Sequence, residues 1–341
     1  MRMLVTGATG FVGQGVARAA LEAGHQVRGL IRDPAKAEAI FGELAIDLAV
    51  GDLMSRRDLL VALEGVEVVV HAAASYSYRR DAASTMLRDN PAIAEVVLSA
   101  ARDAGTPHVI DISSAVVFRP HPDGPHAGTV GVNSPYWDAT QPQWGDPYLQ
   151  SKVLAEEVVG HHRTKGAAVS SVHPSLTIGP GDRGPGQSGS IIVALLASPS
   201  VDLDAGSSWV DVRDVADAVL RLAARPPGDR VILSATDTGY RQLASMLDRL
   251  TSRRVRRIWL PPSLAKAGAS LNDRLGGRLM RDMPTRAGLE WPLGIGPIDG
   301  STGERLLGRP YRPLDETLAD SLRWWADHGT IPRAWIGRLS V

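Results

Sequence analysis

A tyrosine and a lysine four positions apart are the residues best suited to chemistry in this chain. Tyr148 and Lys152 are separated by three residues, and side chains at positions i and i+4 share one face of a helix. An ammonium group beside a phenol favours the phenolate and lowers the pKa of the tyrosine from its reference value of about 10. A tyrosine tuned in this way can donate or accept a proton near neutral pH. Because such a pair also occurs by chance in many helices, its meaning depends on its surroundings.

Two serines follow a predicted strand at a point where they could help this tyrosine. Ser113 and Ser114 come directly after the apolar run from His108 to Ile112. In open α/β sheets, ligands bind at the carboxyl ends of the strands. A serine hydroxyl at that edge can hydrogen-bond the carbonyl oxygen of a substrate and orient it toward the tyrosine. The residues alone leave the choice between the two serines open.

Three glycines near the beginning of the chain have the spacing of a phosphate-binding loop. Gly7, Gly10 and Gly13 lie between a predicted strand and a predicted helix. Glycine permits a tight turn and a close approach of the backbone to a pyrophosphate, and the helix N-terminus offers free N–H groups to the anion. The loop therefore predicts a dinucleotide cofactor, and we expect contacts from the neighbouring residues Thr9, Phe11 and Val12.

The end of the second predicted strand bears on which dinucleotide is bound. Arg32 stands where a basic side chain would accommodate the 2′-phosphate of NADP, whereas an acidic one would bind the ribose 2′-hydroxyl of NAD. Lys36 is close by. Arg32 could also be a solvated surface charge, and Asp33 could turn inward and favour NAD. We predict NADP(H) as the preferred cofactor, with NAD(H) possible.

Two further strand ends are predicted to approach the cofactor. Asp52 and the following Leu53 come after the third strand, where Asp52 could reach the adenine edge or could serve as a turn or helix-cap residue. His71 ends the fourth strand and is interpreted as a packed core histidine. The small side chains after it let the backbone come close to the cofactor, and they belong to Ala72, Ala73 and Ala74.

The order of elements predicts a Rossmann-type α/β fold, a doubly wound parallel sheet with a smaller, mostly C-terminal substrate-binding domain. Nearly continuous apolar runs such as 66–71 are typical of strands buried on both faces, and they alternate with helical stretches such as 92–104. We predict a nucleotide-binding domain from residues 1–180 plus about 209–235. The substrate domain would comprise about 181–208 plus 236–341. The Pro- and Gly-rich segment 119–147 is predicted to be a functional loop.

Composition excludes several classes of protein. The 341 residues carry 37 Lys plus Arg and 37 Asp plus Glu, so no basic field exists to hold nucleic acid or an anionic membrane. The absence of cysteine excludes disulfides, thiolate metal sites and a cysteine nucleophile, and we predict no metal. No signal peptide is visible, and the longest apolar runs fall short of the roughly 20 residues that cross a bilayer. We therefore expect a cytoplasmic protein.

Taken together, these segments resemble the extended short-chain dehydrogenase/reductase family, the NAD-dependent epimerase/dehydratase superfamily. The matching segments are Thr-Gly-Ala-Thr-Gly-Phe-Val-Gly at 6–13, His-Ala-Ala at 71–73, Ser-Ser-Ala at 113–115, Tyr and Lys at 148 and 152, His-Pro-Ser-Leu-Thr-Ile-Gly-Pro-Gly-Asp at 173–182, Trp-Val-Asp-Val-Arg-Asp-Val-Ala at 209–216, and Arg-Pro-Leu-Asp-Glu-Thr-Leu-Ala-Asp-Ser-Leu-Arg-Trp-Trp at 312–325. The resemblance covers almost the whole chain.

The resemblance implies a role for each matching residue. Tyr148 would be the general acid/base, Lys152 would bind the nicotinamide ribose and lower the pKa of Tyr148, and Ser114 would be the catalytic serine. His173 and Pro174 would contact the cofactor. Asn90 also matches a family asparagine, but its role stays open because Ile-Ala replaces the usual Gly-Thr at 93–94. A homodimer is possible, as this family often dimerises.

Within the family, absent residues narrow the reaction. Sugar dehydratases carry an Asp-Glu pair where this chain has Ala115 and Val116, and epimerases usually have Tyr-Gly where it has Phe118 and Arg119. The chain looks more like the dihydroflavonol-reductase and 3β-hydroxysteroid-dehydrogenase-like branch, which interconverts carbonyls and alcohols on bulky, fairly apolar molecules. We predict an NADP(H)-dependent carbonyl reductase or alcohol dehydrogenase. The alternatives are a nucleotide-sugar epimerase with tightly bound NAD and, third, a non-catalytic dinucleotide-sensing regulator.

Four residues are candidates for contact with the small-molecule substrate. Ser75, Tyr76 and Tyr78 follow the fourth strand, near the expected position of the nicotinamide, and Tyr136 belongs to the long loop. The tyrosines could equally be ordinary core or surface aromatics.

Overall fold

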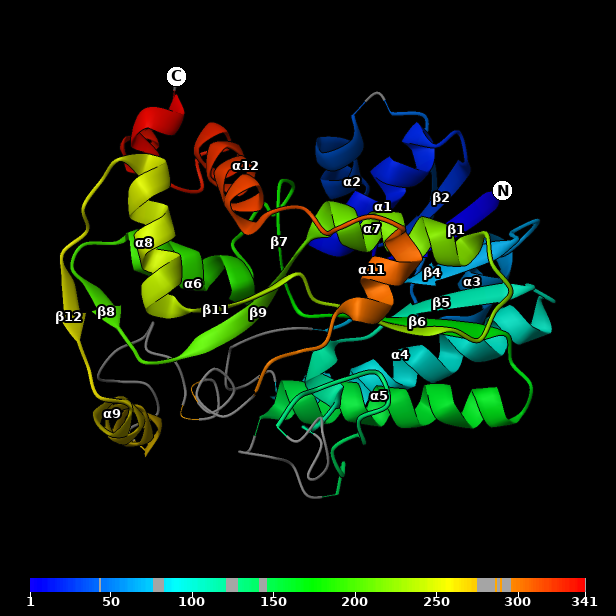
Figure 1. Ribbon diagram of the computed structural model, residues 1–341. Helices are drawn as coiled ribbons and strands as arrows, with labels where there is room; N and C mark the ends of the chain where they lie inside the picture. Colours follow the sequence, from blue (N-terminus) through cyan, green and yellow to red (C-terminus); the bar gives the residue numbers. More distant parts are fainter. Residues whose placement is uncertain are drawn as a thin grey trace.

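The computed structural model describes residues 1–42, 44–75, 83–120, 128–140, 146–274, 286, 289 and 296–340. Its centre is a seven-stranded sheet in the order β10-β6-β5-β4-β1-β2-β3, in which every neighbouring pair is parallel (Figure 1). The strands are β1 (Arg2–Thr6), β2 (Gln26–Ile31), β3 (Asp47–Val50), β4 (Val68–His71), β5 (His108–Ile112), β6 (Val169–Pro174) and β10 (Arg230–Leu233). The strand order reverses direction between β1 and β4, as in doubly wound folds. The predicted fold class is confirmed.

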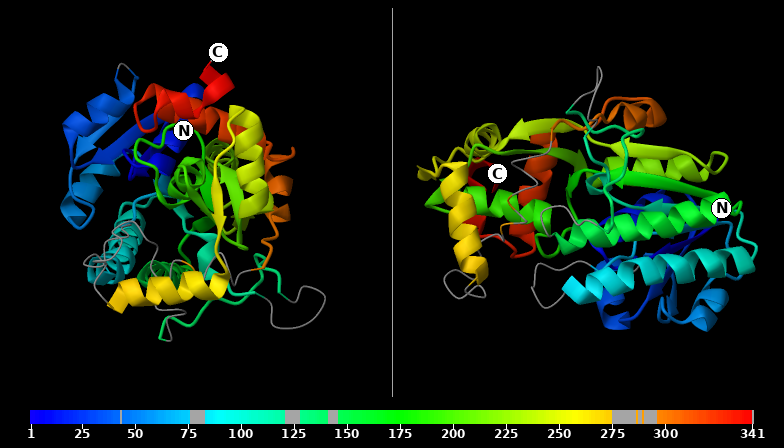
Figure 2. Two further views of the ribbon diagram at one scale, coloured as in Figure 1. Left: turned by 90° about the vertical axis from the view of Figure 1, so that its left-hand side faces the viewer. Right: turned by 90° about the horizontal axis from the view of Figure 1, so that it is seen from below.

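Helices cover both faces of this sheet. One face carries α1 (Phe11–Glu22), α2 (Pro34–Phe41) and α7 (Val212–Ala223), and the other carries α3 (Arg56–Ala62), α4 (Ala83–Asp103) and α5 (Pro147–Thr164) (Figure 1). Helices α4 and α5 lie side by side along the sheet (Figure 2). Two separate hydrophobic clusters result, one on each face, because the β-branched residues of the strands point alternately up and down.

Helix α4 is longer than its sequence pattern indicates. We expected the helix to begin at Ala92, since proline disfavours a helix interior, but the helix starts by Ala83 and carries Pro91 inside. A proline removes a single backbone hydrogen bond. The apolar face continues across it, with Met86 and Ala94 buried on either side, so packing outweighs that loss.

A second region extends from the carboxyl edge of the main sheet. It contains a three-stranded sheet of β7 (Leu176–Ile178), β9 (Gly206–Asp211) and β11 (Thr236–Gly239), and the pair β8 (Ser200–Asp202) and β12 (Arg257–Trp259). Its helices are α6 (Gln187–Leu196), α8 (Tyr240–Thr251), α9 (Pro262–Arg274) and α12 (Leu314–Asp327). The core of this region is a separate cluster that includes the buried indoles of Trp209 and Trp325.

The predicted division into two domains stays a prediction, and one element crosses it. Helix α11 (Ser301–Leu307) comes from the C-terminal third, yet it packs on β10 and α7 of the nucleotide-binding part (Figure 1). Nearby, Arg309 and Arg312 pair with the fully buried Asp214 of α7. These contacts fix the C-terminal segment to the main sheet. Within the described ranges, no helix has both the length and the apolar character needed to cross a membrane.

Candidate active site

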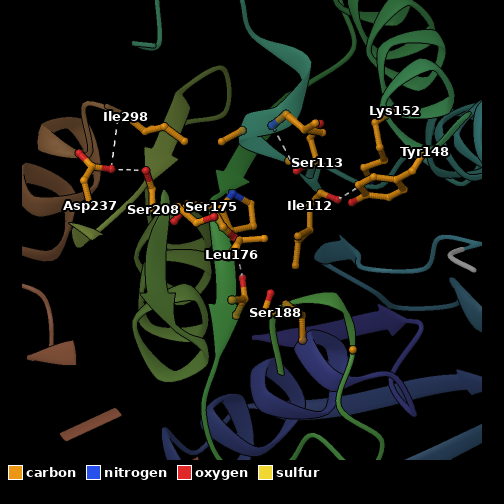
Figure 3. A pocket seen from close by; sticks show the side chains of 18 of the residues that line it. Ile112, Ser113, Tyr148, Lys152, Ser175, Leu176, Ser188, Ser208, Asp237 and Ile298 are labelled. Atoms are coloured by element: carbon orange, nitrogen blue, oxygen red, sulfur yellow. Dashed lines mark hydrogen bonds between the residues drawn. The ribbon is translucent and has the colours of Figure 1, made fainter. Parts of the chain in front are cut away.

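A cavity of about 540 Å³ lies at the carboxyl ends of the central strands. One wall comes from the glycine loop, the end of β4 and the end of β5. The opposite wall comes from β7, β9 and β11 of the second region. Figure 3 shows Tyr148 and Lys152 on one side of this cavity and Ser208 and Asp237 on the other. This is the edge at which doubly wound folds bind their ligands.

The glycine loop forms a cradle so closely packed that a Cβ atom on Gly7 or Gly13 would collide with nearby backbone. Gly7 has a φ of +68°, and a Cβ there would lie 2.8 Å from the backbone nitrogen of Ala73. A Cβ on Gly13 would lie 2.2 Å from the carbonyl oxygen of Gly7. Gly10 donates its N–H to that same oxygen at 2.8 Å, so the turn closes on itself directly before α1 begins. The exposed first-turn N–H groups of α1 then suit a pyrophosphate.

The tyrosine and lysine are placed by a well-defined helix start. The Asp146 carboxylate accepts hydrogen bonds from the N–H groups of Tyr148 and Leu149 at 2.9 and 3.4 Å, and Pro147 occupies the first turn. This is a strong N-terminal signal, with an acidic cap followed by proline. It sets Tyr148 and Lys152 one turn apart on α5, and both side chains line the cavity. The Lys152 Nζ donates to the carbonyl oxygen of Ile112 at 3.2 Å (Figure 3).

The structure distinguishes the two serines that the sequence left open. Both line the cavity, but the Ser113 hydroxyl donates to the Glu156 carboxylate. The Ser114 oxygen accepts a hydrogen bond from the N–H of Val116 at 3.3 Å. That bond uses a lone pair of Ser114 and leaves its hydroxyl hydrogen available to a ligand. The geometry therefore favours Ser114 for contact with a substrate oxygen.

Behind the serines lies a buried polar network centred on Glu156. One Glu156 oxygen is 2.7 Å from Nε2 of His173, and the other accepts from the Tyr136 hydroxyl at 3.1 Å. Burial alone would raise the pKa of Glu156, but the charge of His173 and the hydrogen bonds from His173 and Ser113 outweigh it and lower that pKa to about 2. Burial raises the pKa of Tyr136 to about 12, and the Glu156 charge adds to this effect. Glu156 is thus held as a carboxylate.

Two residues for which we predicted ligand contacts belong to this network. Tyr136 also accepts a hydrogen bond from Arg230, and its ring packs on Phe118 with centroids 4.9 Å apart. Tyr136 is not among the residues that line the cavity, and its contact with a substrate stays a prediction. His173 is fully buried with its Nε2 toward Glu156 and is not among the residues that line the cavity, so its contact with a cofactor stays a prediction. The neighbouring Pro174 does line the cavity.

Two more titratable side chains are buried beside Lys152. His71 bonds Thr6 through Nδ1 at 2.8 Å, and burial followed by the Lys152 charge lowers the pKa of His71 to about 3. His71 is therefore a neutral core histidine, as we interpreted it. Burial raises the pKa of Asp111 to about 6, against the opposing attraction of Lys152. The charge of Lys152 therefore favours the ionised form of Asp111 but does not fully offset the cost of burying it.

Asn90 joins the end of β4 to α5. Its Oδ1 accepts the N–H of Ser75 at 2.7 Å, and its Nδ2 donates to the carbonyl of Ser75 at 3.0 Å and to the Ser151 hydroxyl at 2.9 Å. Ser151 in turn donates to the carbonyl of Tyr148 at 2.8 Å. Asn90 therefore acts structurally, on the helix turn that carries Tyr148.

The residues expected to choose the cofactor lie at the end of β2. Asp33 caps α2, because its Oδ1 accepts the N–H of Lys36 at 3.0 Å, and its carboxylate is otherwise exposed. Arg32 is exposed, and no residue in the described part of the chain hydrogen-bonds or ion-pairs with it. The arginine therefore has its whole guanidinium available to a ligand, whereas one oxygen of the aspartate is used by the helix.

The remaining predicted cofactor and substrate residues divide into four groups. Phe11, Val12, Ala72 and Ala74 line the cavity. Asp52 is exposed and accepts the N–H of Met54 at 2.9 Å, a turn contact that leaves a role at adenine open for it and Leu53. Thr9 lies within the glycine loop, and the backbone of Ala73 packs against Gly7 of that loop. Tyr76 and Tyr78 lie outside the described residues.

Sequence reasoning missed the wall opposite Tyr148. Thr177, Ser207, Ser208 and Asp237 line the cavity from three short strands. Strands of three to six residues in a segment rich in glycine and proline leave no readable periodicity. In β9 every residue from Ser208 to Asp211 is buried, so even the structure shows no polar–apolar alternation there. Among the described residues, no group of three or more His, Asp or Glu side chains could hold a metal ion.

Comparisons with known proteins agree with this architecture. The sequence model of the NAD dependent epimerase/dehydratase family matches residues 3–233. The chain is 30% identical over 338 residues to sterol demethylase protein B of Methylococcus capsulatus, covering 97% of this chain and 100% of that one. It is 29% identical over 337 residues to a putative dihydroflavonol 4-reductase of Synechocystis, covering 96% and 95% of the two chains. The crystal structure of gox2253 superposes with a TM-score of 0.81 at 29% identity, covering 96% of this chain and 99% of the other.

Proposed function

The chain belongs to the NAD dependent epimerase/dehydratase family of extended short-chain dehydrogenases/reductases, and from this premise we propose that it is an NADP(H)-dependent reductase of a ketone or aldehyde on a bulky, fairly apolar molecule. The observation that carries the proposal is the convergence of Ser114, Tyr148 and Lys152 on one cavity whose far end is the glycine cradle.

Each of the three side chains has one task in this proposal. A bound reduced nicotinamide would supply the hydride to the carbonyl carbon. The Ser114 hydroxyl hydrogen holds the carbonyl oxygen, and the Tyr148 hydroxyl donates the proton to it. The Lys152 ammonium, anchored on the Ile112 carbonyl, favours the tyrosinate that remains. The reverse direction uses the same groups in the opposite order.

The cofactor preference rests on Arg32. A guanidinium that is exposed and unpaired within the described residues suits the 2′-phosphate of NADP, because arginine binds phosphate oxygens in a bidentate manner. Asp33, which would favour NAD, uses one carboxylate oxygen to cap α2.

The charge of the cavity favours a reductase over the nucleotide-sugar epimerase alternative. A sugar nucleotide carries a diphosphate, which proteins hold with cationic side chains. Among the described residues that line the cavity, Lys152 is the single cation, whereas Asp146, Asp182 and Asp237 are acidic. The positions of Ala115 and Val116, which also line the cavity, offer no acid or base for the removal of water.

Replacement of Tyr148 by Phe tests the proposal. We expect NADPH consumption with bulky ketones to fall about 10²- to 10⁴-fold, because only the proton donor is lost, while NADPH binding stays near that of the parent. Tyr311→Phe is the matched control, since the Tyr311 hydroxyl bonds the Gly300 carbonyl away from the cavity. Undiminished turnover in Tyr148→Phe would reject the mechanism. Stoichiometric NAD released on denaturing the purified protein would instead favour the epimerase.

A further inference from the structure

The cavity wall opposite Tyr148 carries an organised polar pair. Ser208 of β9 and Asp237 of β11 face each other in the register of the antiparallel ladder, and the Ser208 hydroxyl donates to Oδ1 of Asp237. The backbone N–H of Ile298 approaches the same oxygen at 3.5 Å (Figure 3). Ser208 is buried and Asp237 is exposed, and these two contacts orient the Asp237 carboxylate at the cavity wall.

This pair retains unused capacity to accept hydrogen bonds. Both of its contacts within the described chain go to Oδ1, and no described residue donates to Oδ2. An ionised carboxylate only accepts hydrogen bonds, with about four lone-pair sites. Ser208 gives its hydrogen to Asp237, so its own oxygen is also left as an acceptor. The pair can therefore accept a hydrogen bond from a donor group on a ligand.

A second polar point lies between this pair and the catalytic serines. The Ser175 hydroxyl oxygen is buried, lines the same cavity and has no hydrogen-bond partner in the described part of the chain. Figure 3 places Ser175 between Ser208 and Ser113. Buried polar groups without partners are uncommon because leaving them unsatisfied costs free energy. A polar group on a ligand would satisfy it.

We infer that Ser208 and Asp237 form a distal subsite that binds a hydroxyl group of the substrate, remote from the carbonyl that reacts at Tyr148. The inference rests on the proposed function and names its substrate class: an elongated, uncharged carbonyl compound with a hydroxyl at its far end. A carboxylate or phosphate there is repelled by Asp237. An ammonium group would also be attracted by the exposed Asp237 carboxylate, so it is the competing assignment that the experiment must separate from a hydroxyl.

The test compares four ketones that share one skeleton and differ only at the end remote from the carbonyl: hydroxyl, methyl, ammonium or carboxylate. Turnover with NADPH and calorimetric binding to the NADPH-loaded enzyme are both measured. For the parent we expect the hydroxyl compound to exceed the methyl compound about 10-fold in kcat/KM, the size of one hydrogen bond to a charged acceptor, and the carboxylate compound to be the poorest.

Two variants identify the residue responsible. Asp237→Ala should abolish the preference for hydroxyl over methyl, and Asp237→Asn should also improve the carboxylate compound, because the amide brings donors and no charge. Because Asp237 lines the cavity, the readout is the ratio of kcat/KM for the hydroxyl and methyl compounds within each variant. Asp204→Asn is the control, since Asp204 is exposed in the same region and does not line the cavity.

The outcomes separate the subsite from the proposed function. If the enzyme reduces the ketones but shows no preference for the hydroxyl compound, or a preference that Asp237→Ala does not remove, the subsite is overturned and the reductase proposal stands. Hydroxyl-selective binding lost in Asp237→Ala, but without turnover of any ketone, overturns the reductase and keeps the subsite. Tighter binding of the ammonium compound than of the hydroxyl compound overturns the assignment to a hydroxyl. Equal binding of all four compounds overturns the subsite as well.

Discussion

Glu156 and His173 form a fully buried contact in which Oε1 of Glu156 lies 2.7 Å from Nε2 of His173. Glu156 stands on α5, one turn after Lys152 and two turns after Tyr148, while His173 lies on β6. The same carboxylate takes the hydroxyls of Ser113 and Tyr136. One side chain therefore ties α5 to the ends of β5 and β6, and so fixes Tyr148 and Lys152 relative to the serines.

Replacement of Glu156 by Gln should destabilise the protein in a pH-dependent way. The pKa of Glu156 is lowered from 4.5 to about 2 in the folded protein. Its stabilising contribution is therefore complete above the unfolded value and is lost as the pH falls through the folded one. We expect the variant to be about 2–4 kcal/mol less stable at pH 7, and the gap to close between pH 4.5 and 2. Urea unfolding at several pH values measures it.

The exposed neighbour Glu157 provides the matched control for that series. Glu157→Gln lies on the same helix and should leave stability within about 0.5 kcal/mol of the parent. A gap between parent and Glu156→Gln that stays constant at all pH values would show that the amide disturbs packing only. In that case the carboxylate charge would not hold the network together.

Replacement of Asp111 by Asn should stabilise the protein at neutral pH, which is the opposite of the effect expected for Glu156→Gln. Burial raises the pKa of Asp111 from 3.8 to about 6, so the folded protein holds its proton more tightly than the unfolded chain does. Stability is then lost as the pH rises between these two values, by at most roughly 3 kcal/mol. The variant, which stays neutral, should be more stable than the parent at pH 8 and should match it below pH 4.

Thermal unfolding of Asp111→Asn across this pH range gives the answer, with the exposed Asp229→Asn as the control. A variant that is less stable than the parent at pH 8 would contradict the expectation. It would mean that the attraction between Asp111 and the buried Lys152 outweighs the cost of burying the Asp111 charge.

The sequence was sufficient for the central sheet because its strands are buried on both faces. The run 108–112 has the predicted bounds, since most of its residues are apolar and the strand is buried throughout. The predicted helix 92–104 is only the second half of α4, which begins by Ala83 and carries Pro91 inside. Tertiary packing of the apolar face continues across that proline, and sequence periodicity over 92–104 did not indicate this.

The candidate site was harder to predict from the sequence than the central sheet, because its residues come from distant segments of the chain. Glu156 contacts His173, 17 positions after it, and Tyr136, 20 positions before it. No local sequence pattern predicts such contacts. The hydroxyl of Tyr136 contacts Glu156 and Arg230, which the position of Tyr136 in its loop does not indicate. Ser208 and Asp237 meet only through the ladder of two short strands. The motifs near strand ends could be placed because one edge of a parallel sheet gathers them.

Replacement of Gly13 by Ala should abolish most cofactor binding. The added Cβ would lie 2.2 Å from the carbonyl oxygen of Gly7, so the loop must open and lose the cradle. We expect NADPH affinity to fall at least about 10-fold, and stability to fall by about 1–3 kcal/mol from the overpacking. Gly160→Ala on α5 is the control, because a Cβ there meets nothing within 4 Å. Fluorescence titration with NADPH distinguishes them, and unchanged affinity in Gly13→Ala would exclude this loop as the pyrophosphate site.

Replacement of Arg32 by Ala should shift the cofactor preference from NADPH toward NADH. The arginine is exposed after β2, and it should contribute only when a 2′-phosphate is present. We therefore expect the Kd for NADPH to rise about 10- to 100-fold, the value of a charge-assisted contact, while the Kd for NADH stays constant. Arg249→Ala, at an exposed position on α8, controls for a general change in charge. If both affinities fall equally, Arg32 holds the loop and does not select the cofactor; if neither changes, the 2′-phosphate is bound elsewhere or NAD is the natural ligand.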